Sequence, residues 1–287
     1  MQRIDRNTQQ NNRPYIVYLP DNMGTQSYPL VLVQHGGGTR AEFFAERPGK
    51  WDINGAGSTD EFILVFTQAT ELPNSPGSHT WNAGFSAKGI SDADDISYIN
   101  NVLSEVCAAY SIQRDNIFAC GNSNGGMFTY RMAKELSEWF KGIAVAQATA
   151  GGQRGLELAP HFNLPNRETR RMSVFAYHNE FDDNVHYLPT LFRDYPAIFS
   201  SPEDYDWYLT GRREIGFWPS VGAWLTHNGF AQNAGTASTI DTYTINDWAS
   251  SDRLMKTVVN GDPSVTHVWP TSGATQMLRF FTDVMNL

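Results

Sequence analysis

Short apolar runs alternate with amphipathic helical patterns along most of the chain. Apolar runs rich in β-branched and aromatic residues predict strands at residues 15–19, 30–34, 62–66, 116–120, 143–146 and 172–177. Apolar residues at spacings of three and four predict helices at residues 96–110, 127–140 and 272–286. A regular alternation of strand and helix is typical of a parallel sheet with helices on both faces. We therefore expect an α/β protein.

Two stretches interrupt this alternation. Residues 71–89 are rich in Pro, Gly, Ser and Asn, and this composition predicts a long loop. Residues 187–219 carry a concentration of aromatic side chains without a clear period. An irregular insertion of this length is either a lid over a binding site or additional packing.

The composition narrows the class of protein. The chain has 287 residues and a formal net charge of −9, with 18% charged and 13% aromatic residues. Such a composition excludes intrinsic disorder, and the absence of a basic cluster argues against nucleic-acid binding. No apolar stretch is long enough to span a membrane, and residues 1–14 lack the apolar core of a signal peptide. We expect a single domain over residues 1–287, with an undetermined oligomeric state.

The chain has two cysteines, Cys107 and Cys120. They form either one disulfide bridge or two small buried apolar side chains, and the spacing does not decide between these states. No group of His, Cys and carboxylate residues has the spacing of metal ligands, so we predict no metal and no cofactor.

The sequence Gly121-Asn-Ser123-Asn-Gly125 follows a predicted strand and opens a predicted helix. This is the context of the G-x-S-x-G nucleophile elbow, in which a sharp turn exposes the serine hydroxyl. The alternative is a glycine-rich turn with an incidental serine. The strand before the motif and the helix after it favour Ser123 as a catalytic nucleophile.

A second glycine-rich loop, His35-Gly-Gly37-Gly38, follows the strand at residues 30–34. Glycines at that place allow backbone N–H groups to approach a tetrahedral oxyanion closely. We assign the two oxyanion donors to the N–H groups of Gly37 and Asn124, with Gly38 as the alternative to Gly37. A phosphate-binding loop is excluded because no Gly-Lys-Ser/Thr follows.

In hydrolases with this elbow, the acid and the histidine follow the serine in that order along the chain. The loop after the strand at 172–177 offers Asp182 and Asp183, with Glu180 as a weaker candidate. His267 lies between a strand-like segment at 254–259 and the last predicted helix, so its position favours it as the catalytic base.

These residues together resemble the esterase family that includes polyhydroxybutyrate depolymerases and acetylxylan and feruloyl esterases. The resemblance is carried by Gly121-Asn-Ser-Asn-Gly-Gly-Met127, by His178-Asn-Glu-Phe-Asp182-x-x-Val185-x-Tyr187 and by His267-Val-Trp-Pro270. It implies the α/β-hydrolase fold. It also places the triad acid at Asp182 rather than Asp183. The aromatic-rich segment at 187–219, a lid or additional packing, makes the stretch from Asp182 to His267 longer than in the compact members of the family.

The same resemblance implies a secreted or periplasmic serine esterase acting on a small-molecule or polymeric ester. Carbohydrate-linked or aryl esters, such as acetyl and feruloyl esters, are the first expectation, and a polyester is the second. A non-catalytic binding protein on the same scaffold is the alternative from another class. By motif position, Trp81 and Trp269 flank the site, and either ring is expected to stack on a substrate or to pack in the core.

The chain departs from the family pattern at two places near the predicted site. Asn179-Glu180 stands where the family often has Gly-Thr, and Thr266 stands where it has Gly before the histidine. Neither position supplies a catalytic side chain, so we expect these departures to change loop shape and substrate range rather than mechanism.

Overall fold

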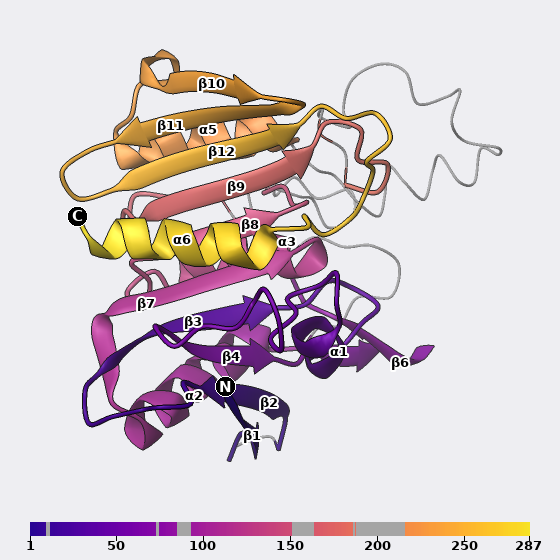
Figure 1. The fold of residues 1–287 in the computed structure, drawn as a ribbon, viewed down its shortest axis with the longest axis vertical. Coiled ribbons are helices and arrows are strands. Elements are labelled where there is room, and N and C mark those ends of the chain that lie inside the picture. The colour runs from indigo at the N-terminus through magenta and orange to yellow at the C-terminus, as the bar shows by residue number, and fades with distance from the viewer. Residues whose placement is uncertain (10–11, 73–74, 85–92, 151–163, 186, 188–215) are drawn as a thin grey trace.

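Ten of the described strands form one sheet, in the order β1-β2-β4-β3-β7-β8-β9-β12-β11-β10 (Figure 1). The computed structural model describes residues 1–9, 12–72, 75–84, 93–150, 164–185, 187 and 216–287. The six central strands are parallel: β4 (Ile63–Thr67), β3 (Tyr28–Gln34), β7 (Ile112–Asn122), β8 (Gly142–Ala146), β9 (Ser173–Asn179) and β12 (Leu254–Asn260). Antiparallel strands extend both edges: β2 (Pro14–Leu19) with β1 (Gln2–Asn7), and β11 (Tyr243–Ala249) with β10 (Thr236–Ile240). The predicted parallel core is confirmed.

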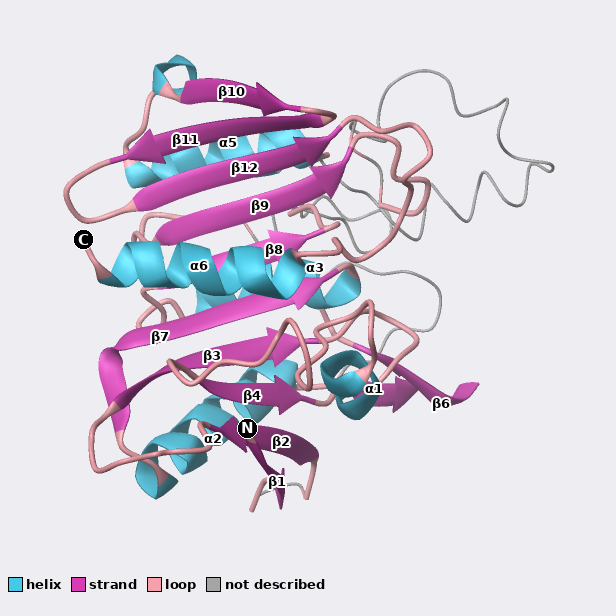
Figure 2. Ribbon diagram, in the orientation of Figure 1, coloured by secondary structure: helices cyan, strands magenta, loops and turns pink. Residues whose placement is uncertain are grey.

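Helices cover both faces of this sheet (Figure 2). One face packs against α2 (Asp95–Ala109), α3 (Asn124–Glu135) and α5 (Phe217–Asn228). The other packs against α1 (Ala41–Glu46) and α6 (Gly273–Met285). Along β3, Leu30 and Leu32 belong to the first core, whereas Val31 and Val33 belong to the second. Because both faces are buried, β3 reads as a continuous apolar run rather than as an alternating one.

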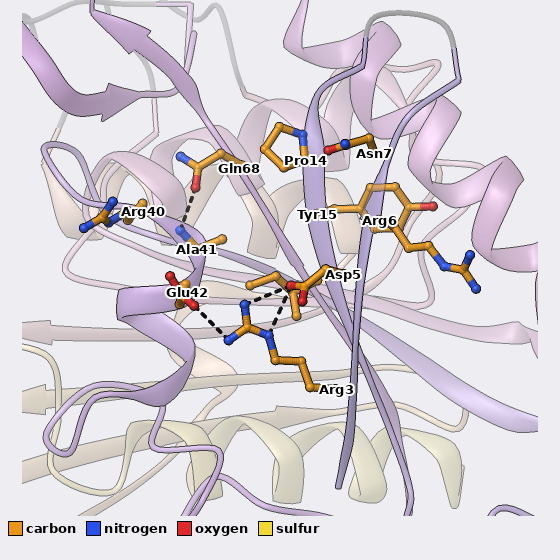
Figure 3. Close-up of a pocket in the computed structure, with 11 residues that line it drawn as sticks. Arg3, Asp5, Arg6, Asn7, Pro14, Tyr15, Arg40, Ala41, Glu42 and Gln68 are labelled. Carbon is orange, nitrogen blue, oxygen red and sulfur yellow. Dashed lines mark hydrogen bonds and ion pairs between the residues drawn. The ribbon is translucent and has the colours of Figure 1, made fainter.

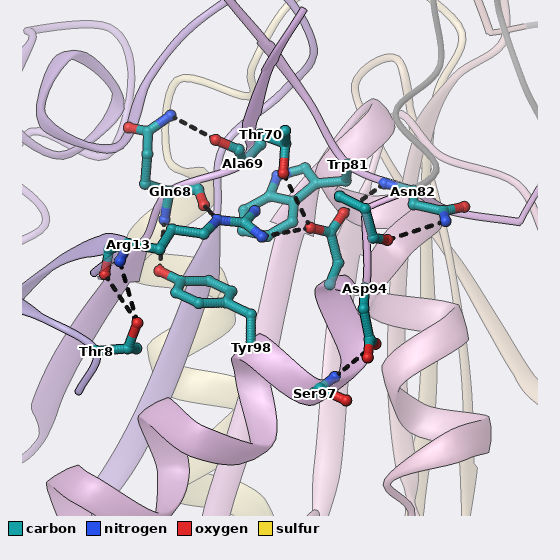
Figure 4. Close-up of polar contacts among 12 residues, drawn as sticks. Thr8, Arg13, Gln68, Ala69, Thr70, Trp81, Asn82, Asp94, Ser97 and Tyr98 are labelled. Atoms are coloured by element: carbon teal, nitrogen blue, oxygen red, sulfur yellow. Dashed lines mark hydrogen bonds and ion pairs between the residues drawn. The ribbon is translucent and has the colours of Figure 1, made fainter. Parts of the chain in front are cut away.

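The predicted helices form with small differences in their bounds. Helix α2 begins at Asp95, and the Asp94 side chain caps it by accepting a hydrogen bond from the Ser97 N–H at 3.0 Å (Figure 4). Helix α3 ends at Glu135, five residues before the predicted end. Leu136 and Phe140 are nevertheless buried, so the apolar spacing continues into the turn after the helix.

The strands that the sequence pattern missed are mostly polar and exposed. Strands β1 and β10 are the edges of the sheet and β11 lies next to β10, and all three bury few side chains. The expected loop at 71–89 contains most of a hairpin, β5 (Thr70–Leu72) and β6 (Ser75–Thr80). Backbone pairing maintains such strands without an apolar period, and hydrophobic patterning therefore does not detect them.

The expected lid at 187–219 falls mostly outside the described residues, which omit 188–215. The expected end at residue 219 is corrected, because helix α5 already begins at Phe217, which is fully buried. Tyr187 stacks on Phe217 with ring centroids 5.6 Å apart, so the two described ends of this segment lie together. A short 3-10 helix, η2 (Gln232–Ala234), follows α5.

Both cysteines are free, which settles the question that the spacing left open. Cys107 belongs to the core beneath α2 and α3, and Cys120 belongs to the core beneath α6. The sheet separates them. None of the helices in the described ranges combines the length and the hydropathy of a membrane span.

Candidate active site

Ser123 stands alone between the last residue of β7 and the first residue of α3. Its backbone angles are φ 53° and ψ −127°, a region that residues other than glycine seldom adopt. A Cβ at Gly121 would lie 2.4 Å from the Gly125 carbonyl oxygen, and a Cβ at Gly125 would lie 2.3 Å from the His35 carbonyl oxygen. The glycines of the G-x-S-x-G motif are therefore required by backbone contact on both sides of the serine.

The structure brings His267 and Asp182 to this serine. The His267 Nε2 atom lies 2.8 Å from the Ser123 Oγ atom, and the Nδ1 atom lies 2.8 and 2.9 Å from the two Asp182 carboxylate oxygens. The Asp182 side chain is fully buried and the His267 side chain is 17% exposed. Because the Nδ1–H group donates to the carboxylate, the Nε2 lone pair faces the serine hydroxyl, which is the arrangement that general-base catalysis needs.

The Asp182 carboxylate is held in its ionised form. Its Oδ1 atom accepts hydrogen bonds from the backbone N–H groups of Asn184 at 2.9 Å and Val185 at 2.7 Å. Burial alone would raise the pKa of Asp182, but the hydrogen bond and charge of His267, with the Val185 N–H, outweigh it and lower the pKa below its ordinary value. The side chains of the other acid candidates, Asp183 and Glu180, are exposed to solvent. Among the three candidates, Asp182 is the one that contacts His267.

The loop His35-Gly36-Gly37 lies directly against the elbow. A Cβ placed on Gly36 would be 3.5 Å from the Ser123 Cβ atom, and one placed on Gly37 would be 3.4 Å from the Asn124 Cβ atom. Within the part of the chain that the structure describes, neither the Gly37 N–H nor the Asn124 N–H has a protein acceptor. The Gly38 N–H donates to the His79 carbonyl at 2.8 Å, so the alternative donor is already occupied.

The buried side chain of His35 orients this loop. Its Nδ1 atom lies 2.8 Å from the Gly36 carbonyl oxygen, and its Nε2 atom accepts the Ala69 N–H at 3.1 Å. Burial lowers the pKa of His35 to about 3, so the ring is neutral and carries its proton on Nδ1. In a trans peptide the carbonyl and the N–H point in opposite directions, so this bond directs the Gly37 N–H away from His35.

The Asn124 side chain has a second role that the sequence did not indicate. Its Oδ1 atom accepts the Trp81 N–H at 2.8 Å, and its Nδ2 atom donates to the Trp81 carbonyl at 3.1 Å. The Trp81 indole N–H in turn donates to the His35 carbonyl at 2.9 Å. One side chain therefore ties the elbow to the segment after β6 and, through Trp81, to the glycine-rich loop.

Trp81 and Trp269 were each expected either to stack on a substrate or to pack in the core, and the burial of both rings favours packing. Trp81 is 1% exposed and stacks face to face on Phe128 at 4.8 Å. Trp269 is 5% exposed and packs edge to face against Phe44 at 5.1 Å. Both rings already have protein neighbours, and burial of a large indole in the core accounts for each position.

A separate cavity of about 330 Å³ opens beside β1, β2 and α1 (Figure 3). Three of its charged groups pair with one another, since the Arg3 guanidinium contacts Asp5 at 2.9 Å and Glu42 at 2.8 Å. Neither Ser123 nor His267 lines this cavity. In the described ranges, no cluster of three or more His, Cys, Asp or Glu side chains could hold a metal ion.

No protein-family model matches the chain. In sequence, the chain is similar to feruloyl esterase B of Thermothelomyces thermophilus, with 28% identity over 159 residues, which cover 53% of this chain and 49% of that protein. In structure, it is similar to an acetyl xylan esterase from Aspergillus awamori, with a TM-score of 0.63 and 16% identity over 98% of this chain and 99% of that one. A ferulic acid esterase from Anaeromyces mucronatus matches with a TM-score of 0.52 and 15% identity over 98% of this chain and 89% of that one.

The curated relatives are longer proteins, of whose length the chain spans 25 to 49%. The sequence likeness therefore covers only part of each relative. The structural likeness covers nearly the whole chain at low identity, and such a likeness establishes a shared fold.

Proposed function

We propose that this chain, an α/β-hydrolase with esterases among its sequence relatives, is a serine esterase that cleaves carboxylic esters through an acyl-enzyme. The observation that carries the proposal is the line of hydrogen bonds from Asp182 through His267 to Ser123, with 2.8 Å at each step. That line ends on a serine held at a strained turn between strand and helix. An incidental serine in a glycine-rich turn needs neither feature.

The reaction proceeds in two steps. The Ser123 Oγ atom attacks the ester carbonyl carbon while the His267 Nε2 atom takes the hydroxyl proton. The tetrahedral intermediate then collapses, and the alcohol leaves with the proton from Nε2. In the second step, water attacks the acyl-enzyme and gives a proton to Nε2, which returns it to Oγ as the acid departs. Asp182 remains ionised throughout and stabilises the imidazolium.

The two N–H groups of Gly37 and Asn124 hold the oxyanion in both steps. Their support is geometric, because the glycine-rich loop packs on the elbow and neither N–H has an acceptor within the described residues. Losing one such donor costs about 10² to 10³ in rate in other hydrolases.

For the substrate, we propose acetyl, feruloyl or similar esters linked to carbohydrates. The basis is the likeness to feruloyl esterase B and to the acetylxylan esterase/xylanase of Neocallimastix patriciarum. Export from the cell, which the family resemblance implies, is part of the same proposal. Turnover of methyl ferulate and acetylated xylan supports this choice, whereas activity on a polyester film alone favours the polyester alternative.

The test of the mechanism is Ser123→Ala. Loss of the nucleophile is expected to lower kcat for a p-nitrophenyl ester by roughly 10⁴ to 10⁶, because oxyanion donors and binding alone remain. The fold is expected to persist, since alanine fills the same space, and a thermal melt checks this point.

Ser104→Ala is the matched control, because it makes the same change on α2, where the Ser104 hydroxyl bonds to the Asn100 carbonyl. Its kcat should equal that of the wild type. A Ser123→Ala enzyme that retains a tenth of wild-type turnover would refute the assignment. A wild type that neither turns over esters nor reacts with a fluorophosphonate would instead indicate a binding protein.

A further inference from the structure

His267 lies in the segment between β12 and α6, which has no regular secondary structure. Its imidazole must nevertheless hold a 2.8 Å contact to Ser123 on a different part of the sheet. Small displacements of a catalytic base are costly, since a shift of about 1 Å can lower a rate 10²-fold. The segment therefore needs anchors close to the histidine.

Two buried amide side chains hold the backbone immediately before and after His267. The Asn179 Nδ2 group donates to the Thr266 carbonyl, and the Gln147 Nε2 group donates to the Val268 carbonyl at 3.2 Å. Both residues are 0% exposed. Because the two acceptors belong to the residues on either side of His267, the amides fix the position of its backbone.

Both amides stand on the rigid sheet. Asn179 is the last residue of β9, and Gln147 directly follows β8. The Gln147 Oε1 atom accepts the Asn179 N–H at 3.2 Å, and the Asn179 Oδ1 atom accepts the Tyr177 hydroxyl at 3.0 Å. Each amide oxygen therefore has a donor of its own, and that partner orients the amide so that its nitrogen faces the His267 segment.

Gln147 adopts this position at a conformational cost. Its φ is 51°, in the left-handed region that non-glycine residues seldom adopt. Asn179 stands at one of the two positions where the chain departs from the family pattern, and the glycine often found there has no side chain to reach Thr266. Neither amide bonds to the Ser123 hydroxyl or to the His267 ring. Any effect of these two residues on the reaction is therefore exerted through the position of His267.

We propose that Asn179 and Gln147 are positioning residues that hold His267 in line with Ser123. This inference rests on the proposed esterase function. It assigns to Asn179 the anchoring of the Thr266 carbonyl, which the glycine often found at this position in the family could not provide.

The test compares Asn179→Ala and Gln147→Ala with the wild type. We expect kcat to fall 10- to 100-fold in each variant with KM changed less than threefold, because the base is misplaced while the binding surface is intact. In the double variant, the combined loss should be smaller than the product of the single losses, since both amides hold one segment.

Asn228→Ala is the matched control. Asn228 is also a buried amide, and it bonds to the N–H and carbonyl of Met172 at the other end of β9. This variant is expected to lose stability while keeping kcat. Wild-type kcat in both Asn179→Ala and Gln147→Ala would overturn the proposal, as would an equal loss of kcat in Asn228→Ala.

A second readout does not depend on ester cleavage. In proton NMR, the His267 Nδ1–H bonded to Asp182 is expected to give a low-field resonance in the wild type and in Asn228→Ala. It should broaden or disappear in Asn179→Ala and Gln147→Ala, and its persistence in both would overturn the proposal. If the wild type proves inactive on esters, the esterase proposal fails, while this resonance still decides the positioning role.

Discussion

At His35, one buried side chain links the stability of the protein to the geometry of its site. The neutral ring bridges the Gly36 carbonyl and the Ala69 N–H, and its pKa is lowered to about 3 because burial disfavours the charged form. In the unfolded chain the ring has its ordinary pKa of 6.5. Between these values the unfolded chain binds more protons than the folded protein.

The stability that His35 contributes is therefore complete above pH 6.5 and is lost as the pH falls toward about 3. The slope is on the order of 1 kcal/mol for each pH unit. In His35→Asn, an amide can still reach the Gly36 carbonyl but does not titrate, so the free energy of unfolding should depend less steeply on pH. Urea denaturation at pH 5 and pH 7 measures this difference, and equal slopes in the two proteins would contradict it.

At the level of elements, the two adjacent aspartates at the start of α2 have different partners, and Figure 4 shows Asp94 beside Ser97. Asp94 is the N-cap of α2, and its side chain accepts a hydrogen bond from the Ser97 N–H. Asp95 is fully buried, pairs with the Arg13 guanidinium at 2.6 Å and accepts the Asn82 N–H at 2.6 Å. It therefore joins α2 to the residue before β2 and to the segment after Trp81.

Asp95→Asn leaves the Arg13 cation, whose side chain is 13% exposed, without its counter-charge. Removing one partner of a buried pair typically costs about 3–5 kcal/mol, and we expect a loss of that size in the free energy of unfolding. Asp94→Asn is the matched control, because asparagine caps helices as well as aspartate does, and should stay within about 0.5 kcal/mol of the wild type. Urea denaturation at pH 7 tests both, and an Asp95→Asn protein as stable as Asp94→Asn would disprove the role.

For the whole molecule, the sheet divides the interior into two cores. Residues that alternate along β3 enter opposite cores, and the same division separates Cys107 from Cys120. Burial raises the pKa of both thiols, so both stay protonated at neutral pH.

We therefore expect the melting temperature to be the same with and without a reductant. In the native protein, both thiols should react slowly with a disulfide reagent, and both should react at once in urea. A shift in melting temperature on reduction would contradict the separation of the two cysteines. Rapid labelling of both thiols in the native protein would contradict their burial.

Local patterns along the chain were sufficient to predict the central strands, the helices α2, α3 and α6, and the elbow at Ser123. Strand and helix periods depend on neighbours a few residues away, and a Cβ at Gly121 would meet the backbone of Gly125 within the elbow itself. The positions of Ser123, Asp182 and His267 follow from the order of strands, because parallel strands present their carboxyl ends at one edge of the sheet.

Such patterns did not predict the contacts between distant segments. The packing of Trp269 against Phe44 and the hydrogen bond from Gln147 to the Val268 carbonyl, next to His267, both join residues more than 100 positions apart. An isolated indole or amide in the sequence carries no sign of its partner, since its partner is chosen by packing and by the need to satisfy buried polar groups. The chain pattern thus predicted that Ser123, Asp182 and His267 form one site, and the packed sheet decided which side chains surround them.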